Sequence, residues 1–164
     1  MRRRRFTALW PVLAIAAVQV SGQAAGQEEV LSQCDSNDPN VAIPACTILI
    51  DSGRLDIEIL PRVIEQRANA YAGQYQYDRA IKDYTYAIKL RPDHPSAFDG
   101  RGLAHANRLN FELAIKDYDE AINLKPDHAK ALYHRGLAKF GLCDLDGADA
   151  DIAKARELDP TIGM

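Results

Sequence analysis

The hydrophobic residues in the second half of the chain follow two superposed periods. Within Tyr77–Pro92 they recur every three or four residues, the spacing of one face of an α-helix. The stretch returns 34 residues later as Phe111–Pro126, and again, less well preserved, as Leu145–Pro160. Four columns keep this period in all three copies: Ala80/Ala114/Ala148, Ala87/Ala121/Ala155, Leu90/Leu124/Leu158 and Pro92/Pro126/Pro160. Such a period predicts stacked units, each of which buries its apolar face on its neighbours.

Each unit is predicted to contain two antiparallel helices. The first helices are expected at Arg62–Gly73, Ser96–Asn107 and Lys130–Gly141. Each second helix begins near an acidic residue, which suits a helix N-terminus, and ends before a proline, which cannot continue the helix. The starts lie near Asp78, Glu112 and Asp146, and the ends precede Pro92, Pro126 and Pro160. Residues 62–158 are expected to be almost entirely helical, in three hairpins that form a right-handed stack.

The last helix is predicted to cap the array. Two columns that carry isoleucine in the first two units carry Asp149 and Arg156 in the third. A solenoid needs such a polar outer face where no further unit follows. We expect a monomer, because pairing through two charged positions is costly. The alternative is an end-to-end dimer through this helix.

The N-terminus shows the three parts of a secretory signal peptide. Met1–Arg5 is basic, Phe6–Val20 is mostly apolar, and small residues follow. A membrane anchor is the alternative, but the apolar run is shorter than the ~20 residues of a spanning helix, and Pro11 interrupts it. We expect residues 1–25 to be a cleaved signal peptide and the protein to be exported.

The charge of the chain excludes one class of partner. There are 20 basic and 23 acidic residues, and the leader holds four of the arginines and no acidic residue. The mature chain is therefore acidic, and no basic stripe interleaved with aromatic residues occurs in it. Nucleic acid, which is bound through positive charge, is not an expected partner.

Residues 26–60 are expected to cap the first edge of the array. Asn40–Ile50 has the pattern of a second helix, which predicts a half repeat, although Pro44 would kink this helix. Cys34 and Cys46 flank it. In an oxidising compartment the two cysteines could form a disulfide that stabilises the fold by about 3 kcal/mol. Two unpaired buried thiols are the alternative.

The repeat resembles the tetratricopeptide repeat (TPR) over about residues 61–162. The resemblance rests on a small residue in the first helix, a large residue at the start of the second, a tyrosine column, the alanine columns and the closing prolines. The first three are Ala68/Gly102/Gly136, Tyr77/Phe111/Leu145 and Tyr84/Tyr118. The resemblance implies an all-α superhelix, a solenoid of three full repeats at 61–94, 95–128 and 129–162 after the N-terminal half repeat.

The whole arrangement is similar to small exported bacterial TPR proteins. This similarity implies the periplasm of a Gram-negative bacterium, with secretion or membrane tethering as alternatives.

The chain departs from the family at one column, where arginine replaces the usual leucine. An arginine column and an aspartate column then recur one period apart: Arg67/Arg101/Arg135 and Asp83/Asp117/Asp151. An arginine at a packing position should not be buried unpaired. We predict that each meets an aspartate of a second helix in its own or the preceding unit. Two independent solvated columns are the alternative.

The resemblance implies a non-enzymatic protein–protein interaction scaffold that holds a peptide or protein segment on the concave face of its first helices. The residues suggested for that face are Arg62, Glu65, Gln66, Asn69, Ser96, Asp99, Leu103, Lys130, Tyr133, His134, Leu137 and Phe140. One alternative is that these are ordinary surface residues and the partner binds elsewhere. Another is a membrane-associated assembly or accessory factor, held at the membrane by an uncleaved leader or by a partner.

Some TPR domains clamp a C-terminal carboxylate with lysine, asparagine and arginine side chains. Asn69 and Lys130 match that pattern. Glu65, Gly100 and His134 stand where it has lysine, asparagine and arginine. An acidic residue in the anion site argues against a carboxylate clamp of this type.

Catalytic and metal chemistry find little support in the sequence. His94 and His128 share one column, so the repeat explains them, and His105 and His134 lack the spacing of a metal motif. Cys143 is expected to be a small, partly buried residue in a turn. There is no glycine-rich phosphate loop and no nucleophile elbow. We therefore expect no enzyme activity, no cofactor and no bound metal.

Overall fold

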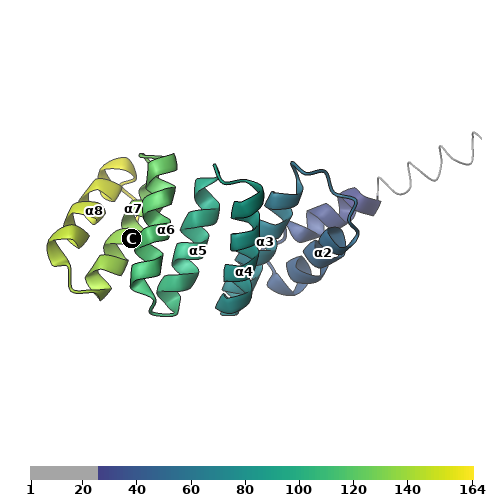
Figure 1. The fold of residues 1–164 in the computed structure, drawn as a ribbon, viewed down its shortest axis with the longest axis horizontal. Helices are drawn as coiled ribbons and strands as arrows, with labels where there is room; N and C mark the ends of the chain where they lie inside the picture. Colours follow the sequence, from purple (N-terminus) through teal and green to yellow (C-terminus); the bar gives the residue numbers. More distant parts are fainter. Residues whose placement is uncertain (1–25) are drawn as a thin grey trace, which may run out of the picture.

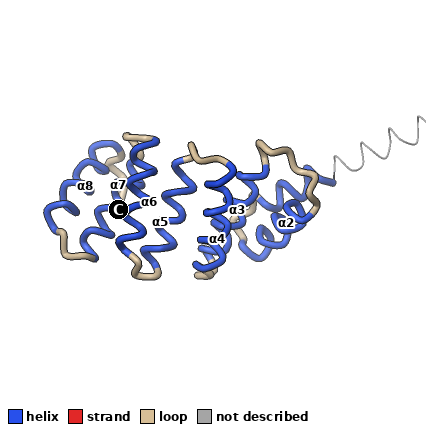
Figure 2. Tube along the Cα trace, viewed as in Figure 1, coloured by secondary structure: helices blue, strands red, loops and turns tan. Residues whose placement is uncertain are grey.

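The structure is a computed structural model that describes residues 26–164, and this part of the chain consists of helices and turns without any strand (Figure 1, Figure 2). Its helices are α2 (Pro39–Asp51), α3 (Leu60–Gly73), α4 (Tyr77–Leu90), α5 (Pro95–Asn107), α6 (Phe111–Leu124), α7 (Ala129–Gly141) and α8 (Leu145–Leu158). Residues 26–34 form a further helical segment before α2. The predicted signal peptide lies outside the described residues.

The helices stack as consecutive hairpins along the long axis of the molecule (Figure 1). α3 packs on α4, α5 on α6 and α7 on α8, which makes three units. The second helix of the first and of the second unit also packs on the first helix of the unit that follows. The predicted all-α array of three helical hairpins is confirmed.

Small residues set the distance between the paired helices. Ala80, Ala114 and Ala148 are buried, with at most 1% of their surface exposed. Gly136 has no room for a side chain, because a Cβ there would lie 2.7 Å from Ile152 Cγ1 and 3.0 Å from a backbone carbonyl oxygen of α8. The helices of a unit therefore approach as closely as the alanine and glycine columns allow, and the packing repeats with these columns.

The N-terminal end is a hairpin of its own, formed by residues 26–34 and α2. Cys34 and Cys46, the pair that the sequence singles out, are joined by a disulfide with their Cα atoms 4.8 Å apart. Both cysteines are buried in a cluster with Val63 of α3, so the hairpin covers the first edge of the array. The half repeat thus has a partner helix that its pattern does not indicate, and Pro44 lies inside α2.

Each arginine of the arginine column forms a bidentate ion pair with the aspartate of its own unit, which confirms the predicted pairing. The two N–O distances are 2.7 and 2.9 Å for Arg67–Asp83, 2.9 and 2.6 Å for Arg101–Asp117, and 2.8 and 2.6 Å for Arg135–Asp151. The remaining guanidinium nitrogen donates to the preceding second helix, at Thr47, Thr85 and Asp119 respectively. The arginine column therefore ties each unit to the helix before it.

The turns inside the units each hold one residue in the left-handed conformation. These residues are Tyr75 (φ 60°), Leu109 (φ 62°) and Cys143 (φ 63°). Cys143 is a free thiol and is exposed. The prediction that it is partly buried is wrong, because it lies in a turn at the edge of the stack, where Tyr75 and Leu109 are also exposed.

The last helix has a polar outer face. Asp149 and Arg156 are exposed, whereas Ala148 and Ala155 are buried on the side of α8 that packs on α7. Within residues 26–164, the helices are too short or too polar to cross a membrane. The same residues contain no cluster of histidine, cysteine and acidic side chains that could hold a metal ion.

Candidate functional site

The first helices α3, α5 and α7 lie on the inner side of the stack. α3 contacts α5 and α5 contacts α7, whereas among the described helices no second helix contacts the next second helix. The first helices are therefore closer together, and the array curves toward them. We call the surface formed by the outward side chains of these three helices the inner face.

At the junction between the first and second units, polar side chains of the inner face satisfy one another. The Ser96 hydroxyl donates to Glu65 Oε1 at 2.5 Å, and His94 Nδ1 lies 3.1 Å from Glu65 Oε2. The Tyr84 hydroxyl donates to Asn69 Oδ1, also at 2.5 Å. Each of these side chains thus has a partner within the chain.

The N-terminal hairpin engages further candidates at this end of the inner face. Arg62 Nη1 donates to Asp35 Oδ1 at 2.8 Å, and Gln66 Nε2 donates to the same oxygen at 3.1 Å. Asn69 Nδ2 in turn donates to Gln66 Oε1. The residues that the family resemblance suggests in the first unit are therefore occupied by contacts inside the molecule.

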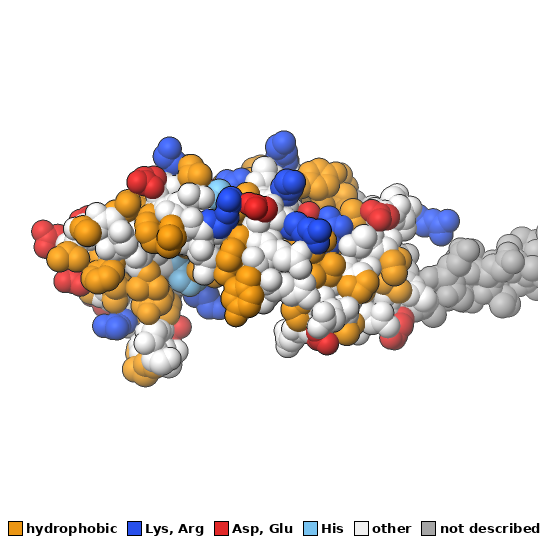
Figure 3. All heavy atoms as spheres, turned by 90° about the horizontal axis from the view of Figure 1, so that it is seen from below, with side chains coloured by type: hydrophobic (Ala, Val, Ile, Leu, Met, Phe, Trp, Pro, Cys, Tyr) orange, Lys and Arg blue, Asp and Glu red, His pale blue; other side chains and the backbone are white. Residues whose placement is uncertain are grey.

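At the junction between the second and third units, the inner face has an apolar hollow of about 170 Å³. We call it the Leu103 hollow. Leu103 of α5 and Leu137 of α7 line it and are 41% and 46% exposed. Its other walls are Ala106, Asn107, Phe111, Tyr118, His134 and Ala138. The space-filling view likewise shows a histidine among apolar side chains in the C-terminal half of the molecule (Figure 3).

His134 connects the hollow to a charged group. Its Nδ1 lies 2.8 Å from Asp99 Oδ1, and its ring centroid lies 5.8 Å from that of Tyr118. The structure therefore brings four of the predicted residues together: Asp99, Leu103, His134 and Leu137.

Tyr118 is the residue of this site that sequence reasoning missed. It is fully buried, and its hydroxyl is one of three buried side-chain polar atoms within residues 26–164 that have no hydrogen-bond partner. Burial raises the pKa of Tyr118 well above its ordinary value, so the hydroxyl stays protonated and able to donate. The sequence contains a signal for this difference, because Leu103 in the second unit replaces Asn69, the partner of Tyr84 in the first.

The remaining predicted residues lie outside the Leu103 hollow. Lys130 is exposed in the first turn of α7, and Phe140 is 63% exposed near the end of the same helix. Tyr133 is in contact with the C-terminal segment, because a Cβ on Gly163 would lie 2.7 Å from its hydroxyl oxygen. None of these three belongs to the wall of the hollow.

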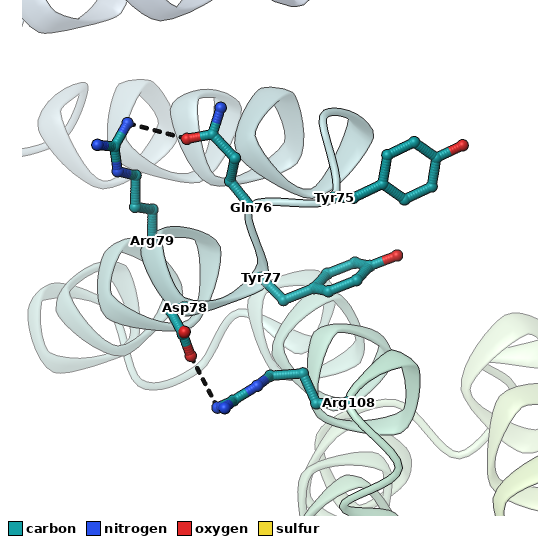
Figure 4. Close-up of a pocket in the computed structure, with 6 residues that line it drawn as sticks. All are labelled: Tyr75, Gln76, Tyr77, Asp78, Arg79 and Arg108. Carbon is teal, nitrogen blue, oxygen red and sulfur yellow. Dashed lines mark hydrogen bonds and ion pairs between the residues drawn. The ribbon is translucent and has the colours of Figure 1, made fainter.

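A larger hollow, of about 390 Å³, lies at the turn between α3 and α4 (Figure 4). The rings of Tyr75 and Tyr77 project side by side there, with centroids 6.3 Å apart. Arg108 pairs with Asp78 at 2.7 Å, and Arg79 donates to the neighbouring glutamine. Because its charged side chains already have partners within the chain, this hollow offers less to a ligand than the Leu103 hollow.

Comparison with known families finds matches over two stretches of the array, the first unit and the α6–α7 segment. A sequence profile described as "Tetratricopeptide repeat" matches residues 61–94, and one described as "TPR repeat" matches residues 110–142. No curated protein matches the sequence.

Solved structures with a similar fold are TPR domains and related proteins. The first TPR of Spaghetti (RPAP3) bound to the HSP90 peptide SRMEEVD is 30% identical over 66% of this chain and 86% of that chain, with a TM-score of 0.63. The Arabidopsis OM64 TPR domain is 28% identical over 65% of this chain and 88% of that one, also with a TM-score of 0.63. MamA is 25% identical over 74% of this chain and 69% of its own, with a TM-score of 0.66.

Proposed function

Because this chain belongs to the tetratricopeptide repeat family, we propose that it is a non-enzymatic interaction scaffold whose inner face holds a segment of another protein. The observation that carries this proposal is the Leu103 hollow, where two half-exposed leucines from different units meet. Water-exposed apolar groups gathered in a hollow mark binding sites, because covering them releases their hydration.

The relatives support a peptide as the bound species. The first TPR of Spaghetti is bound to an HSP90 peptide, SRMEEVD. Three of the last four residues of this peptide are acidic. In this chain Glu65 and Asp99 place carboxylates on the inner face. The proposed segment therefore differs in charge from that peptide, because like charges at close range repel.

The proposed scaffold works outside the cytoplasm. Residues 1–25 have the pattern of a leader, and the Cys34–Cys46 disulfide favours an oxidising compartment, where such bonds persist. The periplasm of a Gram-negative bacterium fits both features. The alternative is an accessory factor held at the membrane by an uncleaved leader. Mass spectrometry of the N-terminus of the native protein distinguishes the two, since only a cleaved leader gives a chain that begins near residue 26.

A capture experiment with matched variants tests the function. The wild-type protein, a Leu103→Asp/Leu137→Asp variant and a Leu113→Asp variant serve as baits in a periplasmic extract of the source organism. Leu113 is a matched control, because it is 47% exposed on α6, a second helix away from the inner face. We expect one protein to be retained by the wild type and by Leu113→Asp but not by the double variant.

The opposite result is equally clear. If all three baits retain the same protein, the inner face is not the binding surface. Circular dichroism of the three baits checks that each is folded. We expect the double variant to fold, because both of its substituted leucines are already half-exposed.

A further inference from the structure

The two tyrosines of the tyrosine column differ in how their hydroxyls are satisfied. Tyr84 donates to Asn69 across its own unit at 2.5 Å. Tyr118 stands one period later, where Leu103 takes the place of Asn69, and its buried hydroxyl has no partner within residues 26–164. A buried hydroxyl without a hydrogen bond is costly, so an unpaired one that borders a hollow needs an explanation.

The ring of Tyr118 is held in place by its neighbours. Gly102 lies directly beneath it, since a Cβ there would be 2.7 Å from ring atom Cε1. His134 packs on it from the third unit, with 5.8 Å between the ring centroids. The ring is therefore fixed in place, and Tyr118 is one of the residues that border the Leu103 hollow.

The hollow has the size of one side chain. An engineered apolar cavity of roughly 150 Å³ holds a benzene molecule, and the Leu103 hollow measures about 170 Å³. Leu103, Leu137 and Phe111 supply apolar walls. A bound chain that places an aliphatic or aromatic side chain here also brings its own main-chain carbonyl groups within a few ångströms.

We propose, resting on the function proposed above, that the Leu103 hollow takes an apolar side chain of a bound peptide segment and that the Tyr118 hydroxyl donates a hydrogen bond to an uncharged acceptor of that segment, such as a main-chain carbonyl. The hydroxyl is the specificity-determining donor of the site. The segment carries no acidic residue next to the apolar one.

The charges around the hollow decide against an acidic segment. His134 lines one wall, and its 2.8 Å contact with Asp99 places a carboxylate next to the hollow. Glu65 adds a second carboxylate to the inner face, toward the first junction. A carboxylate placed at Tyr118 would lie close to Asp99 with no arginine or lysine in the wall to offset it. A neutral or basic segment meets no such repulsion.

The probe is a phage-displayed library of random heptapeptides, selected on the purified wild-type protein. We expect enriched peptides with one large apolar residue and few or no acidic residues. An enriched peptide is then synthesised, and its affinity is measured by fluorescence anisotropy for the wild type, Tyr118→Phe, Tyr84→Phe and Leu137→Asp. Loss of one hydrogen bond to a neutral acceptor should weaken binding by Tyr118→Phe about three- to tenfold. Tyr84→Phe should stay within about twofold of the wild type, and Leu137→Asp should abolish binding.

Thermal unfolding without peptide gives a second readout. Tyr118→Phe should melt at the same temperature as the wild type or higher, because it removes an unsatisfied hydroxyl, whereas Tyr84→Phe should melt lower. Leu103→Asn, which gives Tyr118 the partner that Asn69 gives Tyr84, should raise the melting temperature and weaken peptide binding. A hydroxyl with a merely structural role would not separate stability from affinity in this way.

The outcomes distinguish the two proposals. If no peptide is enriched, or if Leu137→Asp binds as well as the wild type, the inner face does not bind peptides and the proposed function is overturned. If binding depends on Leu137 but Tyr118→Phe binds unchanged, or if acidic peptides are selected, the function stands and the role of Tyr118 is overturned.

Discussion

At the junction between the first and second units, Tyr84 donates to Asn69 and Ser96 donates to Glu65, so the inner face is closed by its own hydrogen bonds. At the junction between the second and third units, Leu103 stands in the place of Asn69, and the Tyr118 hydroxyl has no hydrogen-bond partner among the described residues. Tyr118 also borders the apolar Leu103 hollow. The backbone plan of the two junctions is the same. A few exchanges of residue type, that of Asn69 for Leu103 among them, therefore separate a junction that is complete by itself from one that the proposed ligand would complete.

The packing of the two tyrosine rings shows the same contrast. Tyr84 lies over Gly100 of the next unit, where a Cβ would be 2.6 Å from the ring. One period later His134 replaces Gly100, and its imidazole packs on Tyr118 instead. The second junction thus has His134 and Leu103 where the first has Gly100 and the hydrogen-bonded Asn69. Repeats of equal fold specialise through a few positions of the inner face.

The arginine column crosses both junctions, and breaking it should have the largest effect. Arg101→Ala leaves the Asp117 carboxylate, whose side chain is only 8% exposed, without its partner. Breaking a buried ion pair in this way costs about 3 kcal/mol of unfolding free energy. Arg135→Ala should cost less, since Lys139 Nζ still lies 2.8 Å from Asp151. Urea unfolding of both variants measures the difference.

A double-mutant cycle provides the control for the ion pair. The double variant Asp117→Ala/Arg101→Ala should lose less unfolding free energy than the two single variants lose together. The second substitution removes the charge that the first one leaves without a partner. Strictly additive losses would mean that the two side chains act independently, despite their 2.6 Å contact.

A smaller effect is expected when the first junction is converted into a copy of the second. Asn69→Leu removes the acceptor of the Tyr84 hydroxyl, and Tyr84 is only 3% exposed. An orphaned buried hydroxyl should lower the unfolding free energy by about 1–2 kcal/mol, measured by urea titration. Adding Tyr84→Phe should recover most of that loss. If Asn69→Leu leaves stability unchanged, the hydrogen bond is not what distinguishes the junctions.

The smallest effect concerns the turns, which are alike in all three units. Leu109 is 74% exposed at φ 62°, a conformation that costs a residue with a side chain about 1 kcal/mol relative to glycine. Leu109→Gly should therefore raise the melting temperature slightly, and Cys143→Gly should act in the same direction and by a similar amount. Equal gains in melting temperature would show that these two turns behave alike, so that the junctions differ only on the inner face. A lower melting temperature for either variant would show that the side chain at that position contributes to packing.

The sequence predicts the fold where its columns repeat. The first helices end at Gly73, Asn107 and Gly141 as expected, and they begin only one or two residues earlier than expected. The arginine–aspartate pairs also follow from columns, because both partners lie within one unit and recur with it.

The contacts between units are harder to predict, because they depend on how one unit is rotated on the next. The Asp99–His134 pair joins residues 35 positions apart and occurs only once. The contact of Arg62 with Asp35 has no copy within residues 26–164, because Asp35 lies before the repeated units. A pattern that is read from repetition cannot reveal features that occur a single time.

The disulfide at the N-terminal end of the array makes the two ends differ in how readily they unfold locally. In a solenoid each helix is held by its neighbours, so the ends loosen before the middle. The Cys34–Cys46 disulfide keeps the two helices of the N-terminal hairpin together, whereas α8 packs on α7 alone among the described helices and has no such tie. We therefore expect α8 to fray before the disulfide-linked hairpin does. α8 covers α7, which carries Leu137 and His134, so the proposed binding surface lies at the end of the described array that has no disulfide.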